Sequence, residues 1–248
     1  RLHPGGDSEQ DDCHNAFFHD LLRKIFLLLF AGCLLYFRRF FRILLEMNNC
    51  YQQAAFAFSA NRETQLAADA RIEIAFAGRS NAGKSSALNT LTNQKALARV
   101  SRTPGRTQLI NYFALPEPGC YLVDLPGYGY AEVPEQMRAH WQALLGRYLL
   151  TRAVLRGIVL LMDIRHPMKD LDIRMLECCA ERQLPAHILL TKADKLSRGA
   201  AGKQLQAVRG ELANWRAPFS VQTFSSLKKE GLPALVAQLD QWMVADAG

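Results

Sequence analysis

The sequence predicts an α/β fold, a doubly wound and mostly parallel sheet of six strands in which one strand is antiparallel. Apolar runs alternate with stretches of helical periodicity from about residue 70 onward, and this alternation is typical of doubly wound α/β domains. The runs GIVLLMDI (157–164) and HILLT (187–191) are apolar throughout, as expected for strands that are buried on both faces of a sheet. Such sheets bind their ligands at the carboxyl ends of the strands.

Local patterns place the individual elements. Apolar runs predict strands at residues 72–77, 109–115, 120–124, 157–164, 187–191 and 220–224. Amphipathic stretches predict helices at residues 84–91, 134–155, 168–182, 203–215 and 232–243. Pro134 suits the first turn of the second helix, and Gly157 suits a stop after it.

The composition is that of an ordinary globular protein, with 49% hydrophobic and 21% charged residues in a chain of 248. The six cysteines form no C-x-x-C pair, so we expect reduced thiols in a cytoplasmic protein, with neither a disulfide framework nor a zinc site. The net charge is +7, and residues 1–46 add nothing to it because they hold six basic and six acidic side chains. The excess in the rest of the chain indicates an anionic partner such as RNA.

Residues 1–46 differ in composition from the rest of the chain, and we expect them to be an extension outside a domain at 47–248. Their apolar run at 25–37 has 13 residues, which is shorter than the roughly 20 that a membrane span needs. Several interpretations stay open. The segment is upstream sequence translated from a start site set too early, with Met47 as the native start, or it is an interfacial, membrane-proximal helix, or it is neither.

Residues 78–85, GRSNAGKS, match the phosphate-binding pattern G-x-x-x-x-G-K-[ST]. An expected strand enters this loop and an expected helix leaves it, which is the context that the motif requires. Gly78 and Gly83 let backbone N–H groups turn toward phosphate oxygens, and the helix N-terminus adds its positive dipole end. We expect Lys84 to reach the β- and γ-phosphates and the Ser85 hydroxyl to ligate Mg²⁺. The motif predicts a nucleoside triphosphate and leaves its base open.

Two later motifs fit the γ-phosphate end of such a nucleotide. In RTPGRTQLINYF (102–113), Thr107 precedes a strand, and its hydroxyl can complete the Mg²⁺ shell while the γ-phosphate is present. In YLVDLPGYG (121–129), a buried strand ends at Asp124, 40 residues after Lys84. The carboxylate of Asp124 can bind Mg²⁺ through water, and the N–H of Gly127 can meet the γ-phosphate.

Two further motifs point to guanine. ILLTKADK (188–195) ends a strand at Thr191, where many guanine sites have Asn, and continues through Lys192, which would lie along the base plane. Asp194 can accept hydrogen bonds from guanine N1–H and the 2-amino group, and adenine lacks both donors, so the motif favours GTP. In TFSSLKKEG (223–231), residues 224–226 are placed to hold the guanine O6 through backbone N–H groups.

Taken together, these motifs resemble the EngB (YihA/YsxC) family of ribosome-biogenesis GTP-binding proteins, which are related to translation factors. The resemblance rests on GRSNAGKSSALN, TPGRTQLINYF, DLPGYGYA, DIRHPMKDLD, LLTKADKL and FSSLKKEG and extends from Met47 to the C-terminus. It implies a P-loop GTPase domain with GTP or GDP as ligand and Mg²⁺ as cofactor. It also implies a role in late assembly of the large ribosomal subunit and in normal cell division and septation. We expect a monomer that binds the large-subunit precursor and ribosomal RNA but no DNA, and a membrane only if residues 1–46 are native.

The residues expected to contact the nucleotide lie in these motifs and are Gly78, Arg79, Ser80, Asn81, Ala82, Gly83, Lys84, Ser85, Gly105, Arg106, Thr107, Gln108, Leu109, Asp124, Leu125, Pro126, Gly127, Thr191, Lys192, Ala193, Asp194, Phe224, Ser225 and Ser226. Catalytic roles are expected for Lys84, Thr107 and Asn81, and Mg²⁺ ligation for Ser85 and Thr107.

Hydrolysis is expected to be slow. Tyr128 holds the position after Gly127 from which other GTPases orient water with Gln, so we expect turnover at about 10⁻⁴ to 10⁻² s⁻¹. Related GTPases with N-x-G-K in the loop use this amide to hold K⁺ against the phosphates, which makes Asn81 a candidate K⁺ ligand. The alternative is that Asn81 only suits the turn. For Tyr128 and Tyr130, a mobile contact surface and solvated loop side chains are equally open.

Two classes of function remain. One is a GTP-hydrolysing assembly factor that leaves the pre-ribosome after turnover. The other is a GTP-controlled binding module, membrane-proximal through residues 15–45, in which hydrolysis is incidental. An ATP-dependent P-loop kinase is disfavoured because Asp194 would have no purpose there.

Overall fold

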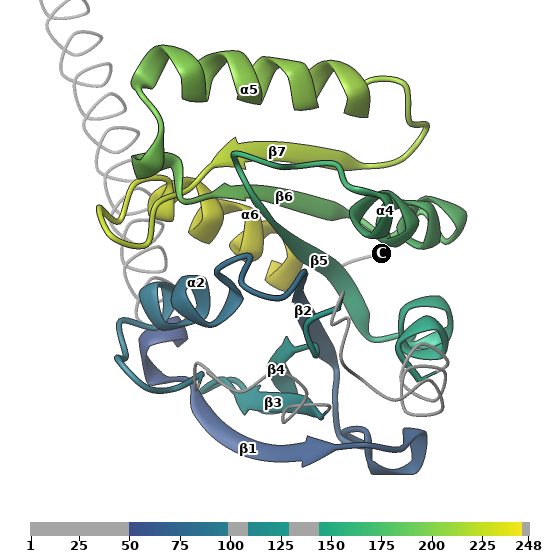
Figure 1. Cartoon of the computed structure of the whole chain (residues 1–248). Helices are drawn as coiled ribbons and strands as arrows, with labels where there is room; N and C mark the ends of the chain where they lie inside the picture. Colours follow the sequence, from purple (N-terminus) through teal and green to yellow (C-terminus); the bar gives the residue numbers. More distant parts are fainter. Residues whose placement is uncertain (1–49, 99–108, 129–143, 245–248) are drawn as a thin grey trace, which may run out of the picture. The chain divides into compact units, whose positions relative to one another are not determined.

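The computed structural model describes residues 50–98, 109–128 and 144–244. Within these ranges, seven strands form one sheet in the order β1-β3-β4-β2-β5-β6-β7 (Figure 1). Strand β3 is antiparallel to both of its neighbours, β1 and β4, while the other pairs of neighbouring strands in these ranges are parallel. The strands are β1 (Ala55–Ala60), β2 (Ile72–Gly78), β3 (Ile110–Ala114), β4 (Cys120–Asp124), β5 (Leu155–Asp163), β6 (Ala186–Thr191) and β7 (Phe219–Thr223).

The expected fold class is therefore confirmed, including its single antiparallel strand, but the expected number of six strands is wrong. The additional strand is β1, which lies at the edge of the sheet and precedes the region where strands were expected. Its sequence, AFAFSA, is half exposed. A bulge between Phe56 and Phe58 interrupts its register with β3, so the side chains do not follow the simple two-residue period that identifies a strand.

Helices cover both faces of the sheet, which is what makes it doubly wound (Figure 1). On one face, α2 and α6 pack against side chains such as Ile74 and Leu161; on the other, the helical residues 144–151, α4 and α5 pack against side chains such as Ala75 and Leu160. The helices with full bounds are α2 (Lys84–Leu91), α4 (Asp170–Glu181), α5 (Arg198–Leu212) and α6 (Leu232–Val244), and the short 3₁₀ turns are η1 (Tyr51–Gln53), η2 (Glu63–Gln65) and η3 (Ala193–Lys195).

Three expected helix boundaries are wrong, and one of them is the end of α5, which was expected at residue 215 but lies at Leu212. The second helix was expected to reach residue 155, but it ends at Thr151 and Leu155 already begins β5. Gly157 lies inside β5 and is therefore not a helix stop. The position needs glycine because a Cβ there would come within 2.6 Å of the Trp242 ring on α6. Helix α5 starts before residue 203 because the Ser197 hydroxyl accepts a hydrogen bond from an N–H in its first turn.

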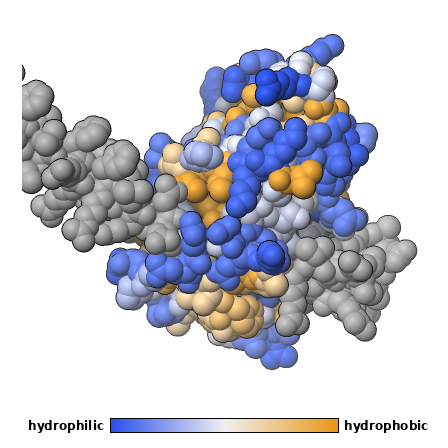
Figure 2. Space-filling view, turned by 90° about the vertical axis from the view of Figure 1, so that its left-hand side faces the viewer, coloured by the Kyte–Doolittle hydropathy of each residue, from blue (hydrophilic) through white to orange (hydrophobic). Residues whose placement is uncertain are grey.

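Some expectations fall outside the described residues, namely those for residues 1–46, for Pro134 at a helix start and for the loop that holds Thr107. Within the described ranges, no helix combines the length and apolar character that crossing a bilayer requires. On the face seen in Figure 2, hydrophilic residues dominate and apolar ones form small separate areas.

Candidate functional site

The predicted nucleotide motifs lie at the carboxyl ends of strands that are neighbours in the sheet. The phosphate loop comes after β2, Asp124 ends β4, Thr191 ends β6, and Phe224 comes directly after β7. Since these strands are parallel, their carboxyl ends lie on the same side of the sheet. All four segments therefore meet at the carboxyl ends of the strands, where α/β proteins bind ligands.

The phosphate loop adopts a conformation that depends on its glycines. A Cβ at Gly78 would lie 2.8 Å from the Leu161 carbonyl oxygen, so only glycine lets β2 approach β5 this closely. Gly83 has a φ of 95° directly before α2, in the left-handed region that side chains rarely adopt. Asn81 has a φ of 62°, which Asn tolerates better than most residues. The geometry thus accounts for Asn81 as a turn residue and leaves its K⁺ role as a prediction.

The base motif is bound directly to the phosphate loop. The Thr191 hydroxyl donates to the Ala82 carbonyl oxygen at 2.6 Å, and Thr191 is 3% exposed. The Lys192 ammonium donates to the Asn81 carbonyl oxygen at 2.8 Å. Thr191 therefore ties the two loops together at the position where Asn is common.

The aspartate expected to read guanine is fixed by the loop after β7. The Ser225 hydroxyl donates to an Asp194 carboxylate oxygen at 2.6 Å, and the Ala193 N–H donates to the Phe224 carbonyl oxygen at 3.1 Å. The hydrogen bond from Ser225 lowers the pKa of Asp194, although partial burial opposes it. Asp194 thus stays an ionised acceptor, which is the form that pairs with the guanine donors.

An ion pair lies at the phosphate end of the site. The Lys84 ammonium pairs with the Asp124 carboxylate, and both groups are largely buried. Ser85 lies in the first turn of α2. In the described part of the chain, no group of three or more His, Cys, Asp or Glu side chains is arranged so that it could hold a metal ion. A hydroxyl and one carboxylate fit Mg²⁺, which usually takes most of its ligands from phosphates and water.

Asp163 at the end of β5 links the base motif to a turn. Its carboxylate accepts from Arg165 at 2.6 Å and pairs with Lys192 at 3.0 Å. The bond from Arg165 is the main reason that the pKa of Asp163 lies well below its usual range. Arg165 therefore stabilises this turn.

Sequence reasoning missed one contact beneath the phosphate loop. The Arg79 side chain reaches Asp172 in α4, with Nε 3.1 Å from a carboxylate oxygen. The Tyr128 hydroxyl donates to the same carboxylate at 2.9 Å. Tyr128 is only 6% exposed, so it is neither the solvated loop residue nor the exposed contact surface that was expected, and Tyr130 lies outside the described residues. A signal did exist, because Asp172 shares a helical stripe with the core residues Met175 and Cys179.

The remaining predicted site residues divide into three groups. Leu125, Pro126 and Phe224 are buried, so they can face a ligand mainly through their backbone. Leu109 is 36% exposed, and Gly127 and Ser226 are partly exposed. Outside the described residues lie Gly105, Arg106, Thr107 and Gln108.

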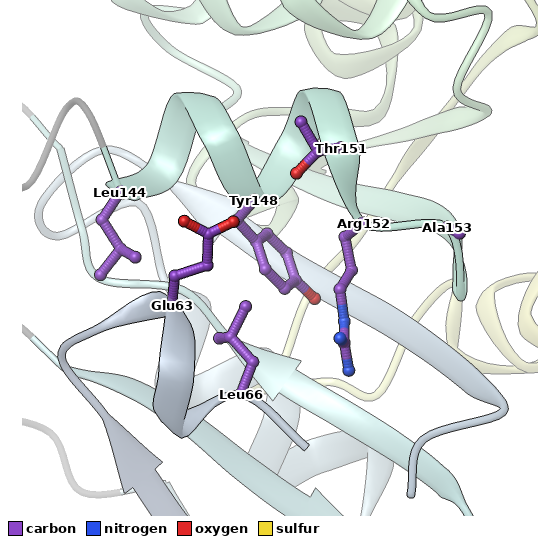
Figure 3. A pocket seen from close by; sticks show the side chains of 7 residues that line it. All are labelled: Glu63, Leu66, Leu144, Tyr148, Thr151, Arg152 and Ala153. Carbon is purple, nitrogen blue, oxygen red and sulfur yellow. The ribbon is translucent and has the colours of Figure 1, made fainter. Parts of the chain in front are cut away.

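A separate cavity of about 310 Å³ contains no residue of these motifs. Figure 3 shows Tyr148 and Arg152 lining it together with Glu63 and Leu66. Tyr148 and Arg152 both bind the buried carboxylate of Glu73, at 2.7 and 3.0 Å. Their polar groups thus have partners within the protein, and the cavity lies near the start of β2, away from the carboxyl ends that carry the motifs.

Known proteins resemble this chain in sequence and in fold. A family model described as "50S ribosome-binding GTPase" matches residues 73–192. "Probable GTP-binding protein EngB" of Pasteurella multocida (strain Pm70) is 57% identical over 192 residues, which cover 77% of this chain and 93% of that protein. The protein of the same name from Escherichia coli O139:H28 is 58% identical over 192 residues, covering 77% and 91%.

Solved structures show the same fold. A crystal structure of a probable GTP-binding protein engB has a TM-score of 0.56 at 18% identity and covers 69% of this chain and 98% of its own. The bacterial selenocysteine-specific elongation factor EF-Sec has a TM-score of 0.51 at 17% identity, covering 70% and 29%. With relatives at 57–58% identity that match over nine-tenths of their own length, the chain belongs to the EngB family of GTP-binding proteins and is a P-loop GTPase.

Proposed function

We propose that this GTPase is a molecular switch that acts in assembly of the large ribosomal subunit, and that normal cell division and septation depend on it. The observation that carries the proposal is the bonded set of loops at one sheet edge, in which an ionised Asp194 is joined through its neighbours to the phosphate loop. Because these loops are hydrogen-bonded to one another, binding of the guanine base and of the phosphates would be coupled.

The ribosomal part of the proposal has two supports. The matching family model carries the description "50S ribosome-binding GTPase". The net charge of +7 favours an anionic partner, and ribosomal RNA in a large-subunit precursor is such a partner. In this proposal the protein is a cytoplasmic monomer, and it contacts a membrane only if residues 1–46 are native.

Each part of the site has a chemical task. Lys84 would bind the β- and γ-phosphates, while Ser85 and Thr107 would ligate Mg²⁺ and Asp124 would hold it through water. Mg²⁺ supplies charge neutralisation at the phosphates. The Gly127 N–H would bind the γ-phosphate, and Asp194 would accept from the guanine base.

Hydrolysis by this chain alone is slow in our proposal. The Tyr128 hydroxyl donates to Asp172, so it is not in use for orienting an attacking water. Asn81, whose amide would hold K⁺ against the phosphates, is the proposed source of added charge stabilisation.

The buried Tyr128 also favours a second candidate function. In this alternative, the chain is a GTP-controlled binding module in which hydrolysis is incidental.

Cellular depletion separates the proposal from a nucleotide site without a ribosomal role. We expect depletion to accumulate large-subunit precursors and to disturb septation, and we expect wild-type protein but not Lys84→Ala to restore both. Unchanged ribosome profiles on depletion would refute the ribosomal role.

A further inference from the structure

Asp172 is a fully buried carboxylate that ends the stretch DIRHPMKDLD (163–172) and lies outside the four segments expected to contact the nucleotide. It lies in the first turn of α4 and is 0% exposed. It accepts from Arg79 Nε at 3.1 Å, from the Tyr128 hydroxyl at 2.9 Å, and from the Lys169 N–H at 3.1 Å. A buried carboxylate is stable only with such partners. Here they come from three segments that are far apart in the sequence.

Two of those segments belong to the nucleotide site. Arg79 is the second residue of the phosphate loop, and Tyr128 comes directly after Gly127. The Ser80 N–H donates to the Tyr128 carbonyl oxygen at 3.0 Å, and the Tyr128 N–H donates to the Gly78 carbonyl oxygen at 3.3 Å. These bonds join the phosphate loop to the segment after Asp124 by a parallel backbone bridge.

This bridge sets the position of Gly127. A Cβ on Gly127 would lie 3.6 Å from both the Gly78 carbonyl oxygen and the Ser80 nitrogen, so its backbone runs closely beside the phosphate loop. The hydrogen bond from the Tyr128 hydroxyl to Asp172 holds the Tyr128 side of the bridge in place. Burial and the nearby Asp172 raise the pKa of Tyr128 well above its usual range, so the phenol stays protonated and keeps donating.

Arg79 anchors the other side of the bridge. Its Nη2 donates to the His166 carbonyl oxygen at 2.6 Å while its Nε binds Asp172. The guanidinium is thereby held between the start of α4 and the turn before it. Both segments of the bridge are thus fixed to the Asp172 carboxylate, one through Arg79 and the other through Tyr128.

We propose that Asp172 is a positioning residue for recognition of the γ-phosphate, because through Tyr128 and Arg79 it fixes where the Gly127 N–H lies relative to the phosphate loop. The inference rests on the nucleotide site proposed above. It makes the preference for GTP over GDP depend on the first turn of α4, since only GTP presents a γ-phosphate to Gly127.

The test compares two tyrosines that have similar surroundings. Tyr128→Phe removes the hydroxyl that binds Asp172. Tyr148→Phe is the matched control, because Tyr148 is 2% exposed and its hydroxyl donates to the buried Glu73 at 2.7 Å. For each variant, affinities for GDP and for a non-hydrolysable GTP analogue are measured by titration, and thermal melting monitors folding.

Tyr128→Phe is expected to weaken binding of the GTP analogue by about threefold to tenfold, a part of what one hydrogen bond to a charged group contributes, while GDP affinity stays unchanged. Tyr148→Phe is expected to lower stability comparably and to leave the ratio of the two affinities unchanged. Asp172→Asn, which keeps an acceptor but loses the charge that holds Arg79, is expected to lower the ratio as well.

If the ratio of the affinity for the GTP analogue to the affinity for GDP were the same in Tyr128→Phe as in Tyr148→Phe, the inference would be overturned. The proposed nucleotide site would be unaffected by that result. If Lys84→Ala bound the GTP analogue as tightly as wild type, the nucleotide site itself would be wrong and the inference would fall with it. Since Tyr128→Phe leaves the buried ring in place, the test does not depend on whether Asp172→Asn folds.

Discussion

Replacing Asp194 by Asn should abolish the preference for guanine with little effect on the fold. The side chain is 9% exposed and is held by the Ser225 hydroxyl at 2.6 Å, and an amide oxygen can accept the same bond. Toward guanine, however, an ionised acceptor of two hydrogen bonds is lost. Hydrogen bonds to charged groups contribute about 1.5–3 kcal/mol each, so two amount to about 3–6 kcal/mol. This corresponds to GTP binding about 10² to 10⁴ times weaker.

The assay is titration of each variant with fluorescent GTP and competition by XTP. Xanthine carries an oxygen where guanine has its 2-amino group, so the Asn amide can donate to it, and Asp194→Asn is expected to prefer XTP. Asp240→Asn is the matched control, because Asp240 on α6 is likewise a carboxylate that accepts a hydrogen bond from a hydroxyl, that of Tyr51 at 2.8 Å. The GTP affinity of this variant should equal that of wild type. If Asp194→Asn bound GTP within about threefold of wild type, the assignment of Asp194 to the base would be refuted.

Three further predictions concern the cation, the pH and the core. Turnover should be about tenfold or more faster in K⁺ than in Na⁺ when ribosomes are present, and Asn81→Ala should remove the difference; equal rates for wild type in both buffers would exclude the K⁺ role. Burial lowers the pKa of His187 below 6.5, so the unfolded state binds the proton first. The free energy of unfolding, from urea titrations, should therefore fall as the pH drops below about 6.5 and level off below the native pKa. This component should be missing in His187→Asn, and an identical pH profile in that variant would contradict it. Gly157→Ala should destabilise by about 1–3 kcal/mol, or roughly 3–10 °C in melting temperature, because its Cβ would lie 2.6 Å from the Trp242 ring; an unchanged melting curve would contradict that packing.

The parallel core and the order of the motifs could be predicted from sequence because both leave strong local signals. Buried parallel strands are apolar throughout, as at 157–164 and 187–191. The phosphate loop carries fixed spacing together with its strand and helix context. Strand β1 leaves no such signal, because it is a half-exposed edge strand with a bulge.

The missed features depend on contacts between distant segments. Gly157 resembles a helix stop in the sequence, and only the Trp242 ring from α6 explains it as a strand residue. Tyr128 resembles a loop aromatic until Asp172 supplies its partner. Asp172 itself could have been noticed as a charge on the apolar stripe of a helix, but its partners Arg79 and Tyr128 lie 93 and 44 residues away.

Control of ribosome binding by GTP can be measured by sedimentation of the purified protein with large-subunit precursors in GTP, in a non-hydrolysable GTP analogue and in GDP. We predict that the protein sediments with the precursors in the analogue and leaves them in GDP, and that Lys84→Ala does not sediment with them in any nucleotide. Association that is absent, or equal in the analogue and in GDP, would contradict the proposal that GTP controls binding to the large subunit.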